Sequence, residues 1–454
     1  MKQKNYKVYL INFIPCIGYG ILSGTLTGAV IFLFKFFAKY AEQYSRTLYQ
    51  LAKGSPFSIM LTFLVLIVFA FLMARLHKAV PECKGGGIPR SEGILRGVLP
   101  FRSIRTFLGT FFGSIISFFA GVPVGSEGPA VLIGTSLSNI VGKKSKNQIA
   151  WSRYVMTGGA GAGFAVATGA PLSGILFALE EIHKRFSPML VLTVSMAVLS
   201  ATGINQLLCN CFDMNPALFT LPKFPALDFT QAGYLLLLGI LIALAVALFD
   251  GSILLFRRFT ALGKKGPVPV KLIVTFTLTG ILCFLLADGS YSGHHLILHI
   301  LEHDMGTVLL LSLFVIRLLM MLLITDSGAT GGIFIPTLAI GALAAALIAK
   351  LLILFGMPAE LSTTMIFLGM CAFIGGTLRA PLTASVLFLE LSGQFTGLFY
   401  VALVVFVVSL ITELFNQTPF YDKALEEMTE TYHHGKQMNI SRFTLIVSKN
   451  DFFV

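Results

Sequence analysis

Three short motifs of glycine and proline could together hold a small anion. GGGIP lies at 85–89, GSEGP at 125–129 and GIFIP at 332–336, and each stands just before an apolar helical run. Proline is tolerated in the first helical turn, where its missing N–H would have no partner. A helix start carries roughly half a positive charge and up to four free N–H donors. Three converging starts would bind an anion without a buried Arg that prevents its release; the plainer alternative is three ordinary helix caps.

Two of these motifs belong to an internal repeat. Residues 170–181 align with 380–391 without a gap, at an offset of 210 residues. Residues 125–134 align with 332–341 at an offset of 207 residues. Because both matches occur in the same order at nearly equal offset, we infer a duplicated unit. Internal repeats are common in secondary transporters, which bind substrate at the repeat interface.

Two carboxylates break the symmetry of this repeat. Glu127 faces Phe334 and Glu181 faces Leu391, so the second copy is apolar where the first is acidic. A charge in an apolar helix costs on the order of 3 kcal/mol, and function is therefore the default hypothesis for both residues. The alternative is a helix end that faces water or a lysine. It carries more weight for Glu181, which stands beside the basic sequence at 183–185.

The composition indicates that the elements around these motifs are membrane helices. Hydrophobic residues make up 56% of the 454 residues and charged residues only 12%, against about 25% charged residues in a soluble domain. This excludes a cytosolic enzyme and a disordered chain. Six Cys in 454 residues are too few for a disulfide scaffold, and the lack of a C-x-x-C pair leaves no zinc or redox motif. The net charge of +12 fits the positive-inside rule better than nucleic-acid binding.

Apolar stretches are too numerous and too short for a bundle of plain spanning helices. Many are interrupted by Gly or Pro, which is tolerated at membrane depth only where protein buries the backbone or a cavity is lined. We therefore predict an all-α polytopic membrane protein with many broken and tilted helices, which points to a transporter or channel. We place it in a bacterial plasma membrane.

Four segments are expected along the chain. They are a first membrane repeat at 1–210, a linker at 211–228, a second membrane repeat at 229–418, and a final helix with a short polar tail at 419–454, without an appended soluble domain. The linker is the most polar break in mid-chain. The first apolar run is longer than the core of a signal peptide, about 7–15 residues, so we expect a retained first span.

These motifs, with SGATGGIFIP at 327–336 and PFY at 419–421, resemble the motif set of the chloride channel (CLC) family of chloride channels and chloride/proton antiporters. Order and spacing fit along nearly the whole chain. The resemblance implies a fold of two inverted repeats and a homodimer with a separate pore in each subunit. It also implies that Glu127 is the external gate, freed from an anion site by protonation. Glu181 is then the internal glutamate that passes protons in the exchangers.

The resemblance implies further that backbone amides at the motifs and one tyrosine hydroxyl hold the anion. The predicted anion-binding residues are Gly86, Gly87, Ile88, Gly125, Gly128, Gly332, Ile333, Phe334 and Tyr421. Two positions depart from the family pattern. Gly86 stands where chloride-selective members have Ser, which removes a hydroxyl ligand and leaves the anion preference open. Ser126 stands where Arg is usual, which removes a charge beside the gate.

We therefore predict a proton-coupled anion antiporter, because channels of the family usually lack the second carboxylate. Chloride is the family default, and a fluoride- or nitrate-preferring exchanger or a passive anion channel of the same fold is the alternative. Expected partners are the anion, protons, membrane lipid and a second copy of the chain, with no cofactor, metal or nucleic acid. The enzymatic alternative is an intramembrane aspartyl protease using Asp250 and Asp288, which no G-x-G-D or nucleophile motif supports.

Two other patterns receive plainer interpretations. GGAGAGFAVATG at 158–169 has alternating glycines like a dinucleotide loop, but no strand precedes it, so we predict close helix packing. His295, His299 and His303 are spaced to share one helix face. Imidazoles at i and i+4 can share a metal ion, although an exposed polar helix end is the commoner arrangement and a pH-sensing role stays open.

Overall fold

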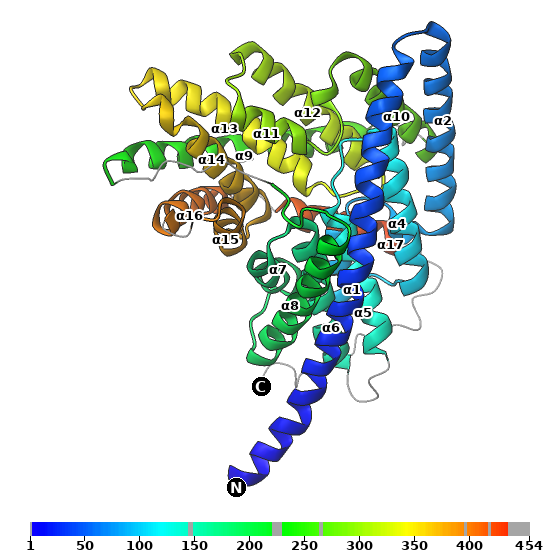
Figure 1. Cartoon of the computed structure of the whole chain (residues 1–454), viewed down its shortest axis with the longest axis vertical. Helices are drawn as coiled ribbons and strands as arrows, with labels where there is room; N and C mark the ends of the chain where they lie inside the picture. Colours follow the sequence, from blue (N-terminus) through cyan, green and yellow to red (C-terminus); the bar gives the residue numbers. More distant parts are fainter. Residues whose placement is uncertain are drawn as a thin grey trace.

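The described part of the chain is built from helices. The computed structural model describes residues 2–143, 149–219, 229–262, 267–394, 397–415 and 419–434 (Figure 1). Apart from one isolated bridge, every regular element of secondary structure in these ranges is a helix. Nine helices in these ranges are long and apolar enough to cross a membrane. The protein is thus an integral, multi-pass membrane protein, and the prediction of an all-α polytopic fold is confirmed.

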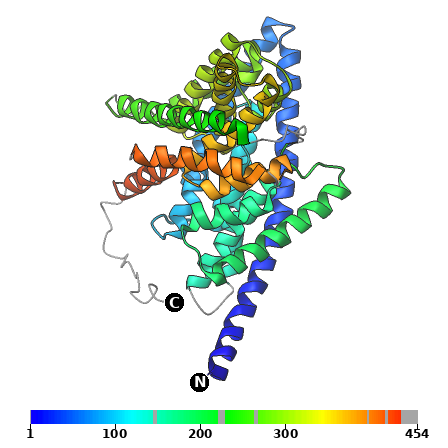
Figure 2. The same cartoon turned by 90° about the vertical axis from the view of Figure 1, so that its left-hand side faces the viewer.

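The helices form two consecutive sets along the chain. α5–α8 lie below α11–α16 in both views, whereas α2 packs beside α10 (Figures 1 and 2). The first set comprises α1 (Lys2–Ala52), α2 (Pro56–Ala79), α3 (Ile88–Leu95), α4 (Ser103–Ala120), α5 (Glu127–Gly142), α6 (Ile149–Thr168), α7 (Pro171–Phe177), the π-helical turn η2 (Ala178–His183) and α8 (Pro188–Cys211).

The second set comprises α9 (Ala232–Leu262), α10 (Val268–Leu285), α11 (His294–Glu302), α12 (Thr307–Ser327), α13 (Phe334–Leu354), α14 (Ser362–Leu378), α15 (Pro381–Ser392), α16 (Leu398–Leu414) and α17 (Phe420–His434). Short 3₁₀ turns at Pro81–Cys83, Phe229–Gln231, Ala287–Gly289 and Ala359–Leu361 join some of them.

The first helix is longer than the charge-free run that suggested it. It continues through Lys35 to Ala52 and follows the whole height of the molecule (Figure 2). Lys35 lies within this helix, and its ammonium donates a hydrogen bond to the Val166 carbonyl at 2.9 Å. Gly24 also lets α1 approach α8 closely, since a Cβ there would overlap the Ala197 carbonyl.

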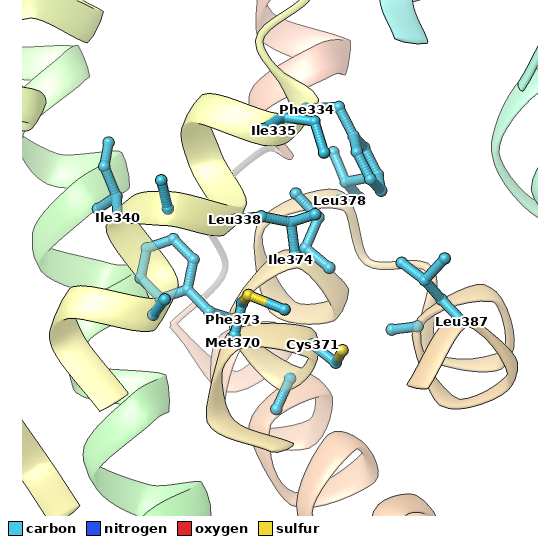
Figure 3. Packing of buried hydrophobic residues seen from close by; sticks show 14 of the residues in the cluster. Phe334, Ile335, Leu338, Ile340, Met370, Cys371, Phe373, Ile374, Leu378 and Leu387 are labelled. Carbon is cyan, nitrogen blue, oxygen red and sulfur yellow. The ribbon is translucent and has the colours of Figure 1, made fainter. Parts of the chain in front are cut away.

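The core lies where α13 and α14 pack against each other. Both helices are apolar on all sides and largely buried, unlike α2, whose large side chains face outward. Figure 3 shows Leu338 of α13 beside Ile374 of α14, and Phe373 packs against Gly341. Helices that are apolar all round are expected at the centre of a membrane protein. The start of α13, which carries the third motif, is thereby fixed in the protein interior.

The internal repeat is visible as a reciprocal pair of helix caps. Glu180 accepts hydrogen bonds from the backbone N–H of Leu382 at 3.1 Å and of Thr383 at 2.8 Å, in the first turn of α15. Glu390 likewise accepts from Leu172 and Ser173, in the first turn of α7, both at 2.7 Å. Glu180 and Glu390 are equivalent positions of the predicted repeat. Each copy therefore caps a helix of the other, as expected for a fold of two inverted repeats.

The two copies differ at the end of this helix. In the second copy α15 stays α-helical to Ser392, whereas in the first copy the chain leaves α7 for the π-helical turn η2. Glu181 lies in that turn. Short π-helical segments widen a helix by one residue and occur often at functional sites.

The four-segment division stays a prediction. α8 ends at Cys211 and α9 begins at Ala232, on either side of the proposed linker. Residues 220–228 of that linker and 435–454 of the proposed tail lie outside the described residues.

Candidate anion and proton site

The three glycine-proline motifs meet through their backbones. Gly125 and Gly332, equivalent positions of the repeat, form an antiparallel bridge with N···O distances of 2.6 Å and 2.7 Å. The Gly85 N–H donates to the Gly328 carbonyl at 3.1 Å, and the Gly331 N–H donates to the Gly85 carbonyl at 3.4 Å. The structure thus brings together segments that are more than 200 residues apart in the sequence.

Glycine is required where the first and second motifs touch. A Cβ on Gly128 would overlap the Gly86 carbonyl, and a Cβ on Gly87 would overlap the Gly128 carbonyl. Gly87 also has a φ of 81°, in the region that favours glycine. Side chains at these positions would push the two loops apart.

Three helices begin at this meeting point. α3, α5 and α13 start at Ile88, Glu127 and Phe334, and in none of the three does the side chain of the N-cap residue bond to the first turn. Helix starts without such caps leave N–H groups and the positive end of the helix dipole for another partner. The predicted anion-binding glycines all lie in the loops before these helices or in their first turns.

The Glu127 carboxylate lies among these helix starts. Its side chain is buried, with the residue 1% exposed, and Oε1 accepts a hydrogen bond from Ser126 Oγ at 3.0 Å. The backbone amides of Glu127 itself and of Ile335, in the first turn of α13, also act on it. Oε2 is buried without a hydrogen-bond partner. The carboxylate of the first repeat is thus directed at the helix start of the second, where an anion would be favoured.

Tyr421 is close enough to both glutamates to interact electrostatically with each of them. It is the second residue of α17, is 1% exposed, and interacts with the charges of both Glu181 and Glu127. Glu181 is 3% exposed, and its Oε1 is buried without a hydrogen-bond partner. The fold provides no hydrogen bond that would explain why this acceptor is buried.

Aromatic rings pack between the glutamate-bearing segments. Phe164 of α6 stacks on Phe177 of α7 at a centroid distance of 4.2 Å and meets Phe334 of α13 edge-on at 5.1 Å. Phe164 belongs to the glycine-rich run at 158–169, which lies almost wholly within α6, where a Cβ on Gly163 would overlap the Ala130 carbonyl of α5. The prediction of close helix packing for this run is confirmed.

One charged group escaped the sequence reasoning. Glu92, in α3, has a fully buried side chain and is bridged by Arg96 at 2.5 Å and Lys184 at 3.0 Å. Lys184 also pairs with Asp422 at 2.6 Å. The spacing of Glu92 and Arg96, four residues apart in a helix, was a readable signal. The pairing of Lys184 with Asp422, 238 residues apart, had none.

Other candidate residues lie in separate surroundings. The charged neighbours of Asp250 are Lys423 and Arg379, whereas Asp288 approaches His299 at 3.7 Å. The protease hypothesis thus receives no geometric support from a shared aspartate pair.

The histidine pattern is interrupted, because α11 ends at Glu302 and the backbone of His303 is extended. The rings of His299 and His303 still lie 5.0 Å apart. Within the described ranges, no group of three or more His, Cys, Asp or Glu residues could hold a metal ion.

Comparison with known proteins identifies the family of this chain. The family model for voltage-gated chloride channels matches residues 65–413. This chain belongs to the CLC family. An H⁺/Cl⁻ exchange transporter, ClcA, of Vibrio cholerae is 30% identical over 378 residues, which cover 80% of this chain and 78% of that protein. The ClcA of Salmonella paratyphi B is 29% identical over 424 residues, covering 88% and 86%.

Solved CLC structures have the same fold. A slow cyanobacterial Cl⁻/H⁺ antiporter matches with a TM-score of 0.85 at 26% identity, covering 92% of this chain and 99% of that one. A CLC-type fluoride/proton antiporter matches with a TM-score of 0.73 at 20% identity, covering 88% and 96%, which bears on the fold alone. The expected CLC fold of two inverted repeats is confirmed.

Proposed function

We propose that this CLC protein is a proton-coupled anion antiporter that exchanges chloride or a similar small anion for protons. The observation that carries the proposal is the position of the Glu127 carboxylate, buried at the helix starts where an anion would bind. Two negative charges cannot share one set of donors. Anion arrival and Glu127 ionisation are therefore mutually exclusive, and such exclusion is what exchange requires.

Protonation of Glu127 is the gating step in this mechanism. The neutral carboxylic acid loses its attraction to the helix start of α13, and its side chain leaves the donors to the anion. The backbone amides at Ile333 and Phe334 and the Tyr421 hydroxyl then hold the anion. Because these donors carry only partial charges, the anion is released again.

Glu181 is the second proton carrier. It is buried, and its charge and the charge of Glu127 both act on Tyr421. We place the proton path between the two glutamates beside Tyr421 and the anion path through the three loops. Named CLC relatives that exchange Cl⁻ and H⁺ support this assignment.

Chloride is the proposed anion because the exchange transporters of Vibrio cholerae and Salmonella are named for it. The first loop offers backbone alone at Gly86, so discrimination among anions falls to loop geometry and to Tyr421. Fluoride and nitrate are the competitors to test. We propose transport without catalysis of a chemical reaction, because the named relatives are transporters.

We also propose a homodimer with one pore in each subunit. Large apolar side chains stand exposed on α7, α8, α15 and α16, including Leu172 at 49%, Leu207 at 61% and Leu410 at 63% exposure. Lipid and a second copy are both apolar partners for such a face. Crosslinking of the purified protein in lipid, with mass measured on the denatured product, distinguishes them.

Parallel anion and proton flux from purified protein in sealed liposomes tests the proposed function. A chloride gradient should drive protons uphill, and Glu181→Gln should stop the protons while anion flux continues. Chloride, fluoride and nitrate are compared in the same vesicles. Anion flux without proton movement in the unmodified protein would instead establish the passive channel.

A further inference from the structure

Four charged side chains join three helix ends next to Glu181. Lys184, Glu92, Arg96 and Asp422, here called the Lys184 cluster, come from the end of η2, from α3 and its C-cap, and from the first turn of α17. Lys184 Nζ is central, lying 2.6 Å from Asp422 Oδ1 and 3.0 Å from Glu92 Oε1. Arg96 contacts the Glu92 and Asp422 carboxylates at 2.5 Å and 3.8 Å.

The Lys184 cluster reaches from the interior to the surface. The side chain of Glu92 is 0% exposed, those of Asp422 and Lys184 are 24% and 31% exposed, and that of Arg96 is 45% exposed. Exposed ion pairs contribute little to stability. A cluster with a fully buried carboxylate is different, because removing one partner leaves that charge uncompensated.

The same cluster surrounds Glu181 with charge. The groups whose charges act on Glu181 include Lys184, Glu92, Asp422 and Glu180, and among these four the Lys184 ammonium supplies the positive charge. Lys184 follows Glu181 by three residues, so it closes the π-helical turn that holds the glutamate. Its position and charge are thus tied directly to those of Glu181.

The backbone at Lys184 is unusual. Its φ is 55°, a left-handed conformation that is usually occupied by glycine at helix C-termini. A lysine held in this region indicates that its surroundings over-determine its position, which is common at functional sites. The N–H of the next residue, Arg185, donates to the Leu179 carbonyl at 3.2 Å, as at a left-handed helix C-terminus, and the Lys184 ammonium forms the two ion pairs.

Asp422 is the next residue after Tyr421. An ion pair from Lys184 to Asp422 therefore connects the turn that carries Glu181 with the helix start that carries the tyrosine. We propose that Lys184 is a positioning residue for coupled exchange, which holds Tyr421 and Glu181 in a fixed relation so that anion occupancy and proton passage stay linked. This inference rests on the proposed antiporter function.

Lys184→Met tests the role of the ammonium while keeping much of the side-chain length. We expect the number of protons moved per anion to fall by about fivefold or more, the lower end of typical coupling between sites, while anion flux persists. Lys184→Arg should restore the ratio, because a guanidinium can reach both carboxylates. The measurement is parallel proton and chloride flux in sealed liposomes.

Glu427→Gln is the matched control. It removes another ion pair of α17, between Glu427 and Arg257 at 2.7 Å, from a side chain that is 54% exposed. A general loosening of α17 would change the proton-to-anion ratio in both variants. Our inference requires a change in Lys184→Met and none in Glu427→Gln.

Asp422→Asn removes the charge of the other partner in the same ion pair. Because Lys184 and Asp422 act through one ion pair, the double variant should show no further loss beyond either single variant. If the Lys184→Met variant transports no anions, its proton-to-anion ratio cannot be measured. The Asp422→Asn variant is then the test, and a lowered proton-to-anion ratio in it supports the inference. A wild-type ratio in Asp422→Asn, or loss of all flux in both variants, shows a purely structural role and overturns it.

The outcomes also separate this inference from the proposed function. Unmodified protein that moves anions but no protons refutes the antiporter itself. Unmodified protein that moves both, together with a Lys184→Met variant of unchanged ratio, refutes only the role of Lys184.

Discussion

Glu127 and Phe334 show how one residue can separate the two halves of a duplicated scaffold. Both stand at the first position of a helix that begins beside the same glycine bridge. The phenylalanine packs against Phe164, whereas the glutamate carries a carboxylate with one oxygen unsatisfied. The repeat thus supplies a symmetric cradle, and the acid makes it responsive to protons.

Replacing this acid should separate the two transported species. In Glu127→Gln the side chain keeps its size but cannot carry a proton or a charge. We expect proton movement to fall by about a hundredfold or more, the usual scale for losing a positioned proton carrier, while anion flux continues. Parallel flux in liposomes measures both, with the exposed Glu360→Gln as the control. Proton movement that is unchanged in Glu127→Gln contradicts the gate assignment.

Close approach of loops, rather than helix propensity, determines the site at the level of elements. Gly128, the second residue of α5, lies against the Gly86 carbonyl and has no space for a methyl group. Gly203, in α8, faces open space, and a Cβ added there would meet no atom within 4 Å. These two helical glycines therefore form a matched pair.

Gly128→Ala should abolish anion and proton flux together, because it forces the first and second loops apart. Overpacking of this kind costs about 1–3 kcal/mol, so we also expect a lower midpoint of thermal unfolding in detergent. Gly203→Ala should leave transport unchanged and should not lower the unfolding midpoint, because alanine is favoured over glycine in a helix interior by roughly 1 kcal/mol. Normal transport by Gly128→Ala would mean that the contact of these loops is not needed for the site.

The reciprocal caps give a second prediction for elements. Glu390→Ala removes the acceptor for the first turn of α7, and the loss of a helix cap costs about 0.5–2 kcal/mol. We expect a lower unfolding midpoint in detergent for Glu390→Ala and, by the symmetry of the pair, a similar decrease for Glu180→Ala. Glu360→Gln again serves as the control. Midpoints equal to that of the control would show that the caps contribute nothing to stability.

For the whole molecule, sequence patterns predicted the membrane fold and the repeat because both are periodic properties of the chain. The apolar runs and the offset copies can be counted without coordinates. The meeting of Gly85 with Gly328 and Gly331 was predictable only as a convergence of motifs, since a backbone contact between distant loops leaves no compositional mark.

Two features of the site could not be read in advance. The chain is π-helical at Glu181 where the aligned copy stays α-helical, and an ungapped alignment gives no sign of this difference. The ion pair of Lys184 with Asp422 joins two ordinary charged residues from distant parts of the chain. Packing alone brings them together.

The exchange of caps between Glu180 and Glu390 makes the halves interdependent. A fragment that ended in mid-chain would expose the bare first turn of α7, whose acceptor is provided by the missing half, and the complementary fragment would lack the acceptor for α15. Gene duplication could therefore yield this arrangement from a protein that already assembled as an antiparallel pair, with the fused descendant inheriting a contact first made between separate molecules.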